Sequence, residues 1–214
     1  MALVGKKFPD LNVDAMNDMG DTFKVNVLEE AVNNKKKVVL FWYPKDFTFV
    51  CPTELHAFQA AIGEFEKRNT IVIGASCDTP EVHFAWLSTA KDNGGIEGVT
   101  YPILADSNRN LSSILGILDI TNETYNEDTN TVQVEGDNVT YRATYIIDED
   151  GTVQHESINN MPLGRNVGEY LRLVDALTHV QEKGEVCPAN WEEGKSAMGA
   201  NAKSTAEYLA AHAN

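Results

Sequence analysis

The chain has 214 residues, 43% of them hydrophobic, and a formal net charge of −15 with an isoelectric point near 4.6. This length suits one large globular domain, or one domain with a tail. The acidic balance disfavours nucleic-acid backbones and anionic membranes as partners, because no basic patch offsets it. No apolar stretch is long enough to cross a bilayer.

Short apolar runs alternate with helix-period segments in the first half of the chain. The run Val38–Tyr43, which ends at Pro44, predicts a buried central strand. Residues 52–67 carry apolar side chains at spacings of three or four, which predicts an amphipathic helix with Cys51 at its first turn. In the rest of this half we expect strands at 70–75 and 101–104 and helices at 80–92 and 110–117.

The second half begins with an acidic segment, residues 119–138, which we expect to be a long loop and in part a hairpin. The Gly-Asp-Asn sequence at 136–138 fits a turn between two strands. The remaining pattern predicts, in order, a strand pair at 141–147 and 152–158 and helices at 167–181 and 203–211.

This order of elements is that of an elaborated thioredoxin-type sheet, so the predicted fold class is α/β with a C-terminal extension. We expect a thioredoxin-like domain over residues 1–165. After Gly184 the composition changes to small and polar residues. Residues 166–214 are therefore expected to form a helix and a tail that carries Cys187.

The three cysteines, Cys51, Cys77 and Cys187, are an odd and widely spaced set, which is not typical of a disulfide framework. The N-terminus shows no apolar segment or cleavage site of a secretory signal, so we expect a cytoplasmic protein. In a reducing cytosol such cysteines are buried small hydrophobes or reactive thiols. Cys77 ends an apolar strand, which favours a buried, inert thiol.

Cys51 lies at a strand-to-helix turn, where unpaired N–H groups and the helix dipole favour an anion. The thiolate is the nucleophilic form of cysteine, so this position suits an attacking sulfur. Thr48 precedes Cys51 by three residues, and in a tight turn its hydroxyl could reach the sulfur or a bound peroxide. Pro44 opens the turn.

A thiolate that reduces a peroxide needs donors for the charge that grows on the leaving oxygen. Arg142 begins an apolar strand, where a charged group needs a partner, and Glu54 is one turn after Cys51. We expect Glu54 to orient Arg142. The product, a sulfenic acid, is rescued when a second thiol condenses with it, a part that Cys187 can play.

Other interpretations of these residues exist. A lone cysteine at a helix start is often structural. A zinc site could be drawn from Cys51, His56, Cys77 and His83, but Cys51 and His56 are five apart on a helix and do not share a face. We therefore expect no metal.

The sequence from Pro44 to Cys51, PKDFTFVC, matches the P-x-x-x-T-x-x-C signature of the peroxiredoxins. Cys51-Pro-Thr-Glu-Leu and the late Val186-Cys-Pro188 resemble the typical two-cysteine subfamily, and more closely its bacterial alkyl hydroperoxide reductase C branch. The similarity extends from Val4 through Tyr208.

The resemblance implies a thioredoxin-like fold and reduction of hydrogen peroxide and organic hydroperoxides, without metal or other cofactor. It implies that Cys51 is the peroxidatic cysteine, shielded by Pro44, and that Thr48 and Arg142 bind the peroxide. Cys187 would be the resolving cysteine, which this subfamily supplies from the partner subunit of a dimer. Five such dimers commonly form a ring, and thioredoxin or a dedicated flavoprotein reduces the disulfide.

Two departures concern over-oxidation. Family members that are sensitive to it carry a G-G-[LVI]-G motif and a C-terminal Tyr-Phe pair, whereas this chain has Gly-Gly-Ile-Glu at 94–97 and Tyr208-Leu209. We therefore expect Cys51 to resist conversion to the sulfinate. The segment 119–138 is also longer than the family leads us to expect.

Two other classes of function compete with a thiol peroxidase. A chaperone-like binding role, known for over-oxidised rings of the family, is disfavoured by the two departures. A thioredoxin-type disulfide exchanger is disfavoured because the first cysteine of C-x-x-C is replaced by Thr48.

Overall fold

The computed structural model describes residues 2–212, which divide into two compact units, Met1–Arg165 and Asn166–Asn214. The elements of the first unit are β1 (Asn12–Met16), β2 (Thr22–Asn26), α1 (Val27–Asn34), β3 (Lys37–Trp42), α2 (Cys51–Ala60), α3 (Ile62–Lys67), β4 (Thr70–Ser76), α4 (Pro80–Leu87), the short 3-10 helix η1 (Lys91–Asn93), β5 (Ile103–Ala105), α5 (Asn110–Leu115), β6 (Asn122–Asn126), β7 (Thr131–Glu135), β8 (Arg142–Ile147) and β9 (Val153–Asn159). The second unit contains α6 (Val167–Lys183) and α7 (Ala202–His212).

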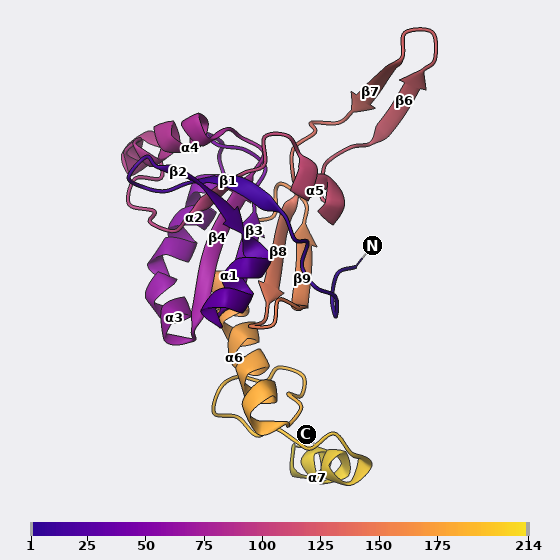
Figure 1. Cartoon of the computed structure of the whole chain (residues 1–214). Coiled ribbons are helices and arrows are strands. Elements are labelled where there is room, and N and C mark those ends of the chain that lie inside the picture. Colours follow the sequence, from indigo (N-terminus) through magenta and orange to yellow (C-terminus); the bar gives the residue numbers. More distant parts are fainter. Residues whose placement is uncertain (1, 213–214) are drawn as a thin grey trace. The chain divides into compact units, whose positions relative to one another are not determined.

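A seven-stranded mixed sheet forms the centre of the first unit, in the order β2-β1-β5-β4-β3-β8-β9 (Figure 1). The pairs β3–β4 and β4–β5 are parallel, and the other pairs of the sheet are antiparallel. Every residue of β3 is buried. The apolar run from Val38 predicts this for all of them except Lys37, whose ammonium group pairs with Glu149 at 2.7 Å. This α/β architecture, with a helical C-terminal extension, confirms the predicted fold class.

The strands and helices expected around Cys51 are confirmed, but the helices expected over 52–67 and 80–92 differ in length from the prediction. The helix expected over 52–67 is interrupted at Ala61, whose N–H bonds to both Ala57 and Phe58, so it becomes α2 and α3. The helix expected over 80–92 ends at Leu87. There the chain folds back, and a Cβ on Gly95 would collide with the Thr89 carbonyl, so only glycine fits.

The acidic segment contains the hairpin β6–β7, but the turn does not lie where the Gly-Asp-Asn sequence suggested. The hairpin turn is at residues 127–130, where the Asn126 side chain accepts from two backbone N–H groups. Residues 136–138 instead connect β7 to β8, which belongs to the other sheet. The pair β8–β9 is the hairpin expected around residues 148–151. Within residues 2–212, no helix is both long and apolar enough to span a membrane.

Candidate active site

The loop after β3 places Cys51 at the first position of α2. Pro44 is buried directly after the strand, and Phe47 has a φ of 53°, a left-handed conformation that bulky residues adopt at a cost of about 1 kcal/mol. Among residues 2–212, no side-chain hydrogen bond caps the N-terminus of α2. Cys51 is 1% exposed.

Two polar groups approach the sulfur of Cys51. Thr48 Oγ1 lies 2.9 Å from Cys51 Sγ and 2.8 Å from the carbonyl oxygen of Lys45. A guanidinium nitrogen of Arg142, from the start of β8, donates to the same sulfur at 3.4 Å. The sequence therefore predicted correctly that Thr48 and Arg142 would be near this thiol.

Arg142 is held from two sides. It donates to a carboxylate oxygen of Glu54 at 2.6 Å, the pairing expected from the sequence, and its Nε donates to the Met161 carbonyl at 2.6 Å. Glu54 is 3% exposed and Arg142 is 3% exposed, so this ion pair is buried. A buried pair needs its remaining donors and acceptors satisfied.

A second arginine, Arg165, satisfies the rest of Glu54. Its Nε and a second guanidinium nitrogen each donate to a carboxylate oxygen of Glu54 at 2.8 Å, and its backbone N–H donates at 2.9 Å. The guanidinium also lies 5.1 Å from the ring centre of Phe41. Arg165 was not among the residues predicted from the sequence.

The cluster of Glu54, Arg142 and Arg165 carries more positive than negative charge. Burial raises the pKa of Glu54, but the hydrogen bonds and charge of Arg165, with the charge of Arg142, outweigh burial and leave that pKa below its ordinary value. Glu54 is therefore a carboxylate at neutral pH. One carboxylate against two guanidinium groups leaves an excess of positive charge in this cluster, and Arg142 brings the cluster into contact with Cys51 Sγ.

His83 and His56, considered above as zinc ligands, are engaged elsewhere. The two ring nitrogens of buried His83 lie 2.7 Å from Asp46 Oδ2 and 3.1 Å from the Leu104 carbonyl oxygen. His56 Nε2 lies 3.1 Å from the Gly95 carbonyl oxygen. Within the part of the chain that the structure describes, no three His, Cys, Asp or Glu side chains gather in a group that could hold a metal ion.

The other two cysteines have different surroundings. Cys77 is buried, with its sulfur 3.7 Å from Ser112 Oγ, and burial raises its pKa to about 11. Cys187 lies in the second unit, half-buried, with its sulfur 3.7 Å from the Ala176 carbonyl oxygen. Burial raises the pKa of Cys187 as well, and the charge of Arg172 opposes this effect.

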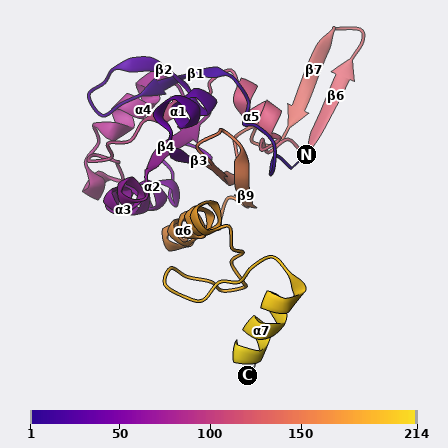
Figure 2. The same cartoon turned by 60° about the horizontal axis from the view of Figure 1, so that its bottom comes forward.

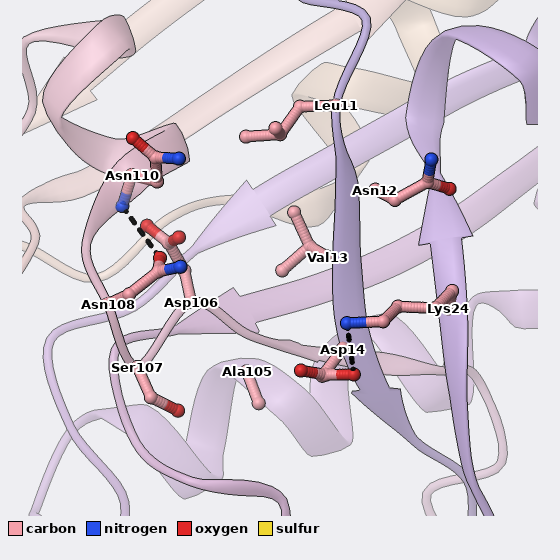
Figure 3. A pocket seen from close by; sticks show the side chains of 10 residues that line it. All are labelled: Leu11, Asn12, Val13, Asp14, Lys24, Ala105, Asp106, Ser107, Asn108 and Asn110. Carbon is pink, nitrogen blue, oxygen red and sulfur yellow. Dashed lines mark hydrogen bonds and ion pairs between the residues drawn. The ribbon is translucent and has the colours of Figure 1, made fainter.

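A polar pocket lies between β1 and the loop after β5, and its lining contains none of the residues around Cys51 (Figure 3). Its polar groups bind one another. Lys24 pairs with Asp14 at 2.7 Å, and Asp106 accepts from the first N–H groups of α5. This pocket therefore contributes to the fold rather than to the thiol site.

Comparison with known proteins decides the family. The sequence profile of the AhpC/TSA family matches residues 4–156, and that of the C-terminal domain of 1-Cys peroxiredoxin matches residues 176–210. The chain belongs to the AhpC/TSA family of peroxiredoxins. It is 38% identical to the chloroplastic 2-Cys peroxiredoxin BAS1 of Hordeum vulgare over 99% of this chain and 92% of the relative.

Two further relatives agree with this assignment. Alkyl hydroperoxide reductase C of Helicobacter pylori is 39% identical over 97% of this chain and 96% of the relative. The crystal structure of reduced 2-Cys peroxiredoxin from Plasmodium vivax superimposes with a TM-score of 0.86 at 36% identity, covering 98% of this chain and all of that one. This peroxiredoxin is accordingly an enzyme, a thiol-dependent peroxidase, as the sequence motifs indicated.

Proposed function

We propose that Cys51 is the thiol that attacks the peroxide. Its thiolate attacks one oxygen of a hydroperoxide, so an S–O bond forms while the O–O bond breaks. The sulfur is oxidised to a sulfenic acid, and the second oxygen leaves as an alkoxide or hydroxide that takes up a proton. The observation that carries this proposal is the presence of both Thr48 and Arg142 within hydrogen-bonding distance of Cys51 Sγ.

In this proposal Thr48 holds the peroxide. Because the Lys45 carbonyl can only accept, it competes for the single hydroxyl proton of Thr48. The lone pairs of Thr48 Oγ1 are then left to accept from the O–H of a hydroperoxide beside the sulfur. Pro44, buried at the start of the loop, would shield this place from water.

Arg142 would stabilise the charge that moves from sulfur to the leaving oxygen. Glu54 fixes the guanidinium from one side and the Met161 carbonyl from the other, so little reorganisation is needed during the reaction. Glu54 is thus a positioning residue that acts through Arg142, and Arg165 stabilises Glu54 in the same way.

Cys187 would resolve the sulfenic acid. Its thiolate attacks the oxidised sulfur of Cys51 in a partner subunit, an S–S bond forms as the S–O bond breaks, and the hydroxide that leaves takes up a proton from solvent to become water. In this scheme residues 1–165 form the peroxidase domain and residues 166–214 carry the resolving thiol.

The assembly and partners follow from this scheme. We propose a homodimer, five copies of which form a ring, and reduction of the disulfide by thioredoxin or by a flavoprotein disulfide reductase. The proposed substrates are hydrogen peroxide and organic hydroperoxides; the name of the H. pylori relative supports the organic hydroperoxides. A cytoplasmic location would supply the reducing conditions that free thiols need.

The test is the mass of the denatured, non-reduced protein after pre-reduced enzyme meets one equivalent of hydrogen peroxide. We expect a rapid shift to a covalent dimer that is lost in Cys187→Ser and kept in Cys77→Ser. An unchanged mass with free Cys51 would refute the assignment of Cys51.

A further inference from the structure

The hairpin β6–β7 is the one part of the acidic segment with regular structure, and it stands apart from the seven-stranded sheet in both views (Figures 1 and 2). Its two strands pair only with each other, and all ten strand residues are exposed. An isolated two-stranded hairpin is marginally stable in water, because it buries little apolar surface. This hairpin therefore contributes little to the core of the peroxidase.

The hairpin is nevertheless well formed. The Tyr125 hydroxyl donates to the Asn130 side-chain oxygen across the turn at 2.8 Å, and Thr129 and Thr131 share a hydrogen bond of 2.7 Å. At its base the Thr121 N–H donates to the Glu135 carbonyl at 2.9 Å, and the Asp119 N–H donates to the Val139 carbonyl at 2.8 Å. The surface it presents is thus preorganised for contact, which lowers the entropic cost of binding.

The two faces of the hairpin differ in composition. Residues directly opposite each other on paired strands share a face, and the pairs Tyr125–Val132 and Glu123–Val134 are opposite. Tyr125, Val132 and Val134 are 57%, 59% and 40% exposed. The other face carries only polar side chains, those of Asn122, Thr124, Asn126, Thr131, Gln133 and Glu135.

The charge of the segment is of one sign. Residues 119–138 contain six carboxylates and no lysine or arginine. The exposed apolar face is therefore surrounded by negative charge, which attracts a basic surface and repels an acidic one. A second copy of this chain carries the same hairpin and a net charge of −15, so electrostatics disfavour it as the occupant.

We propose that the Tyr125–Val132–Val134 face is a docking site for a partner protein whose apolar patch is flanked by lysine or arginine. The apolar side chains would supply the contact and the carboxylates the orientation and the rate of encounter. This role is separate from peroxide reduction, because none of the residues around Cys51 lies in the hairpin.

The probes are two labelled peptides of roughly nine residues, about the length of a strand, one alternating lysine and valine and the other alternating lysine and serine. Fluorescence anisotropy gives their dissociation constants for reduced wild-type enzyme. We expect the lysine–valine peptide to bind about tenfold tighter, because it alone adds apolar contact to the same charge. We also expect both to weaken as salt rises from about 50 to 500 mM.

Three variants locate the site. Tyr125→Ser with Val132→Ser should bring the lysine–valine peptide to the affinity of the lysine–serine peptide. Thr124→Ser with Gln133→Ser, on the opposite face, is the matched control and should leave both affinities unchanged. A variant with residues 121–136 replaced by two glycines should lose the preference while it keeps peroxidase activity, which reports that the rest of the enzyme is folded.

Two outcomes would overturn the proposal. Equal affinity of wild-type enzyme for the two peptides would mean that only general acidity attracts them. If removal of the hairpin, without any peptide, changed the number of subunits per assembly measured by sedimentation, a second copy would cover this face instead.

Discussion

Cys51 and Cys77 are both buried thiols of the same unit, 1% and 8% exposed. The charged groups around the two sulfurs nevertheless differ. Cys51 begins a helix and receives a guanidinium donor. Cys77 follows the end of β4, and after burial itself the charges of Asp106 and Asp78 also raise its pKa, against the hydroxyl of Ser112 and the charge of Arg109. Burial alone therefore does not decide whether a thiol reacts; the donors and charges that meet the sulfur do.

The largest expected effect is the loss of the Cys51 sulfur, compared with the loss of the Cys77 sulfur. Cys51→Ser should reduce the rate of peroxide consumption by more than about 1000-fold, because the nucleophile is gone. Cys77→Ser should leave the rate within about twofold. The measurement is peroxide removal with a chemical dithiol as reductant. A comparable loss in both variants would remove the contrast between the two cysteines.

The second comparison is between the arginines near each thiol. Arg142→Met should slow the oxidation of Cys51 by about 100- to 1000-fold, since it removes a preorganised donor. Arg109→Met, whose charge acts on Cys77 instead, is the matched control and should leave that rate nearly unchanged. Stopped-flow fluorescence of a single turnover separates this step from resolution and reduction. Equal rates in the two variants would mean that Arg142 serves only the fold.

The third prediction uses the pKa of Cys77, near 11. Below that pH its thiolate fraction rises tenfold for each pH unit, so alkylation of Cys77 should be roughly 100-fold faster at pH 10 than at pH 8. The measurement is mass spectrometry of iodoacetamide-treated Cys51→Ser/Cys187→Ser enzyme, with circular dichroism to check that it stays folded. A flat profile would show that Cys77 is ionised well below its expected range.

The fourth prediction compares the hydroxyl of Thr48, which contacts Cys51, with the hydroxyl of Ser112, which lies beside Cys77. Thr48→Val should slow Cys51 oxidation by about tenfold, the equivalent of one hydrogen bond of about 1.4 kcal/mol. Thr48→Ser keeps the hydroxyl and should recover most of the rate. Ser112→Ala removes the hydroxyl beside Cys77 and should not change the rate of Cys51 oxidation. If Thr48→Ser were as slow as Thr48→Val, the hydroxyl alone would not account for the role of Thr48, because serine retains it.

Much of this site could be predicted because its signals are local. The apolar run of β3, the proline after it and the helix period from Cys51 are read within about 30 residues of sequence. Arg142 was found because a charge at the start of an apolar strand requires a partner. Cys77 was read as buried because it ends such a strand.

Arg165 was missed because it meets Glu54 across 111 residues of chain. A signal was present: it directly precedes Asn166, the N-cap of α6, where a positive charge opposes the helix dipole. The strands β1 and β2 were missed because they are five residues long and partly exposed, so neither shows an uninterrupted apolar run. The hairpin turn was misplaced because Asn126 and Asn130 form it without glycine.

The smallest effect concerns over-oxidation, which also separates the two cysteines because a sulfinate forms only when a thiol that one peroxide has oxidised to a sulfenic acid meets a second peroxide. Glu97 is exposed and Leu209 is 60% exposed, so both can be changed without disturbing the core. Since these positions depart from the pattern of sensitive peroxiredoxins, the double variant Glu97→Gly/Leu209→Phe should inactivate a few-fold faster than wild type during turnover at high peroxide. Mass spectrometry should place the added oxygen atoms on Cys51 and not on Cys77.

Wild-type enzyme that inactivates as fast as a sensitive relative would contradict the expected resistance. Sulfinate on Cys77 would mean that its buried, acidic surroundings do not keep it unreactive.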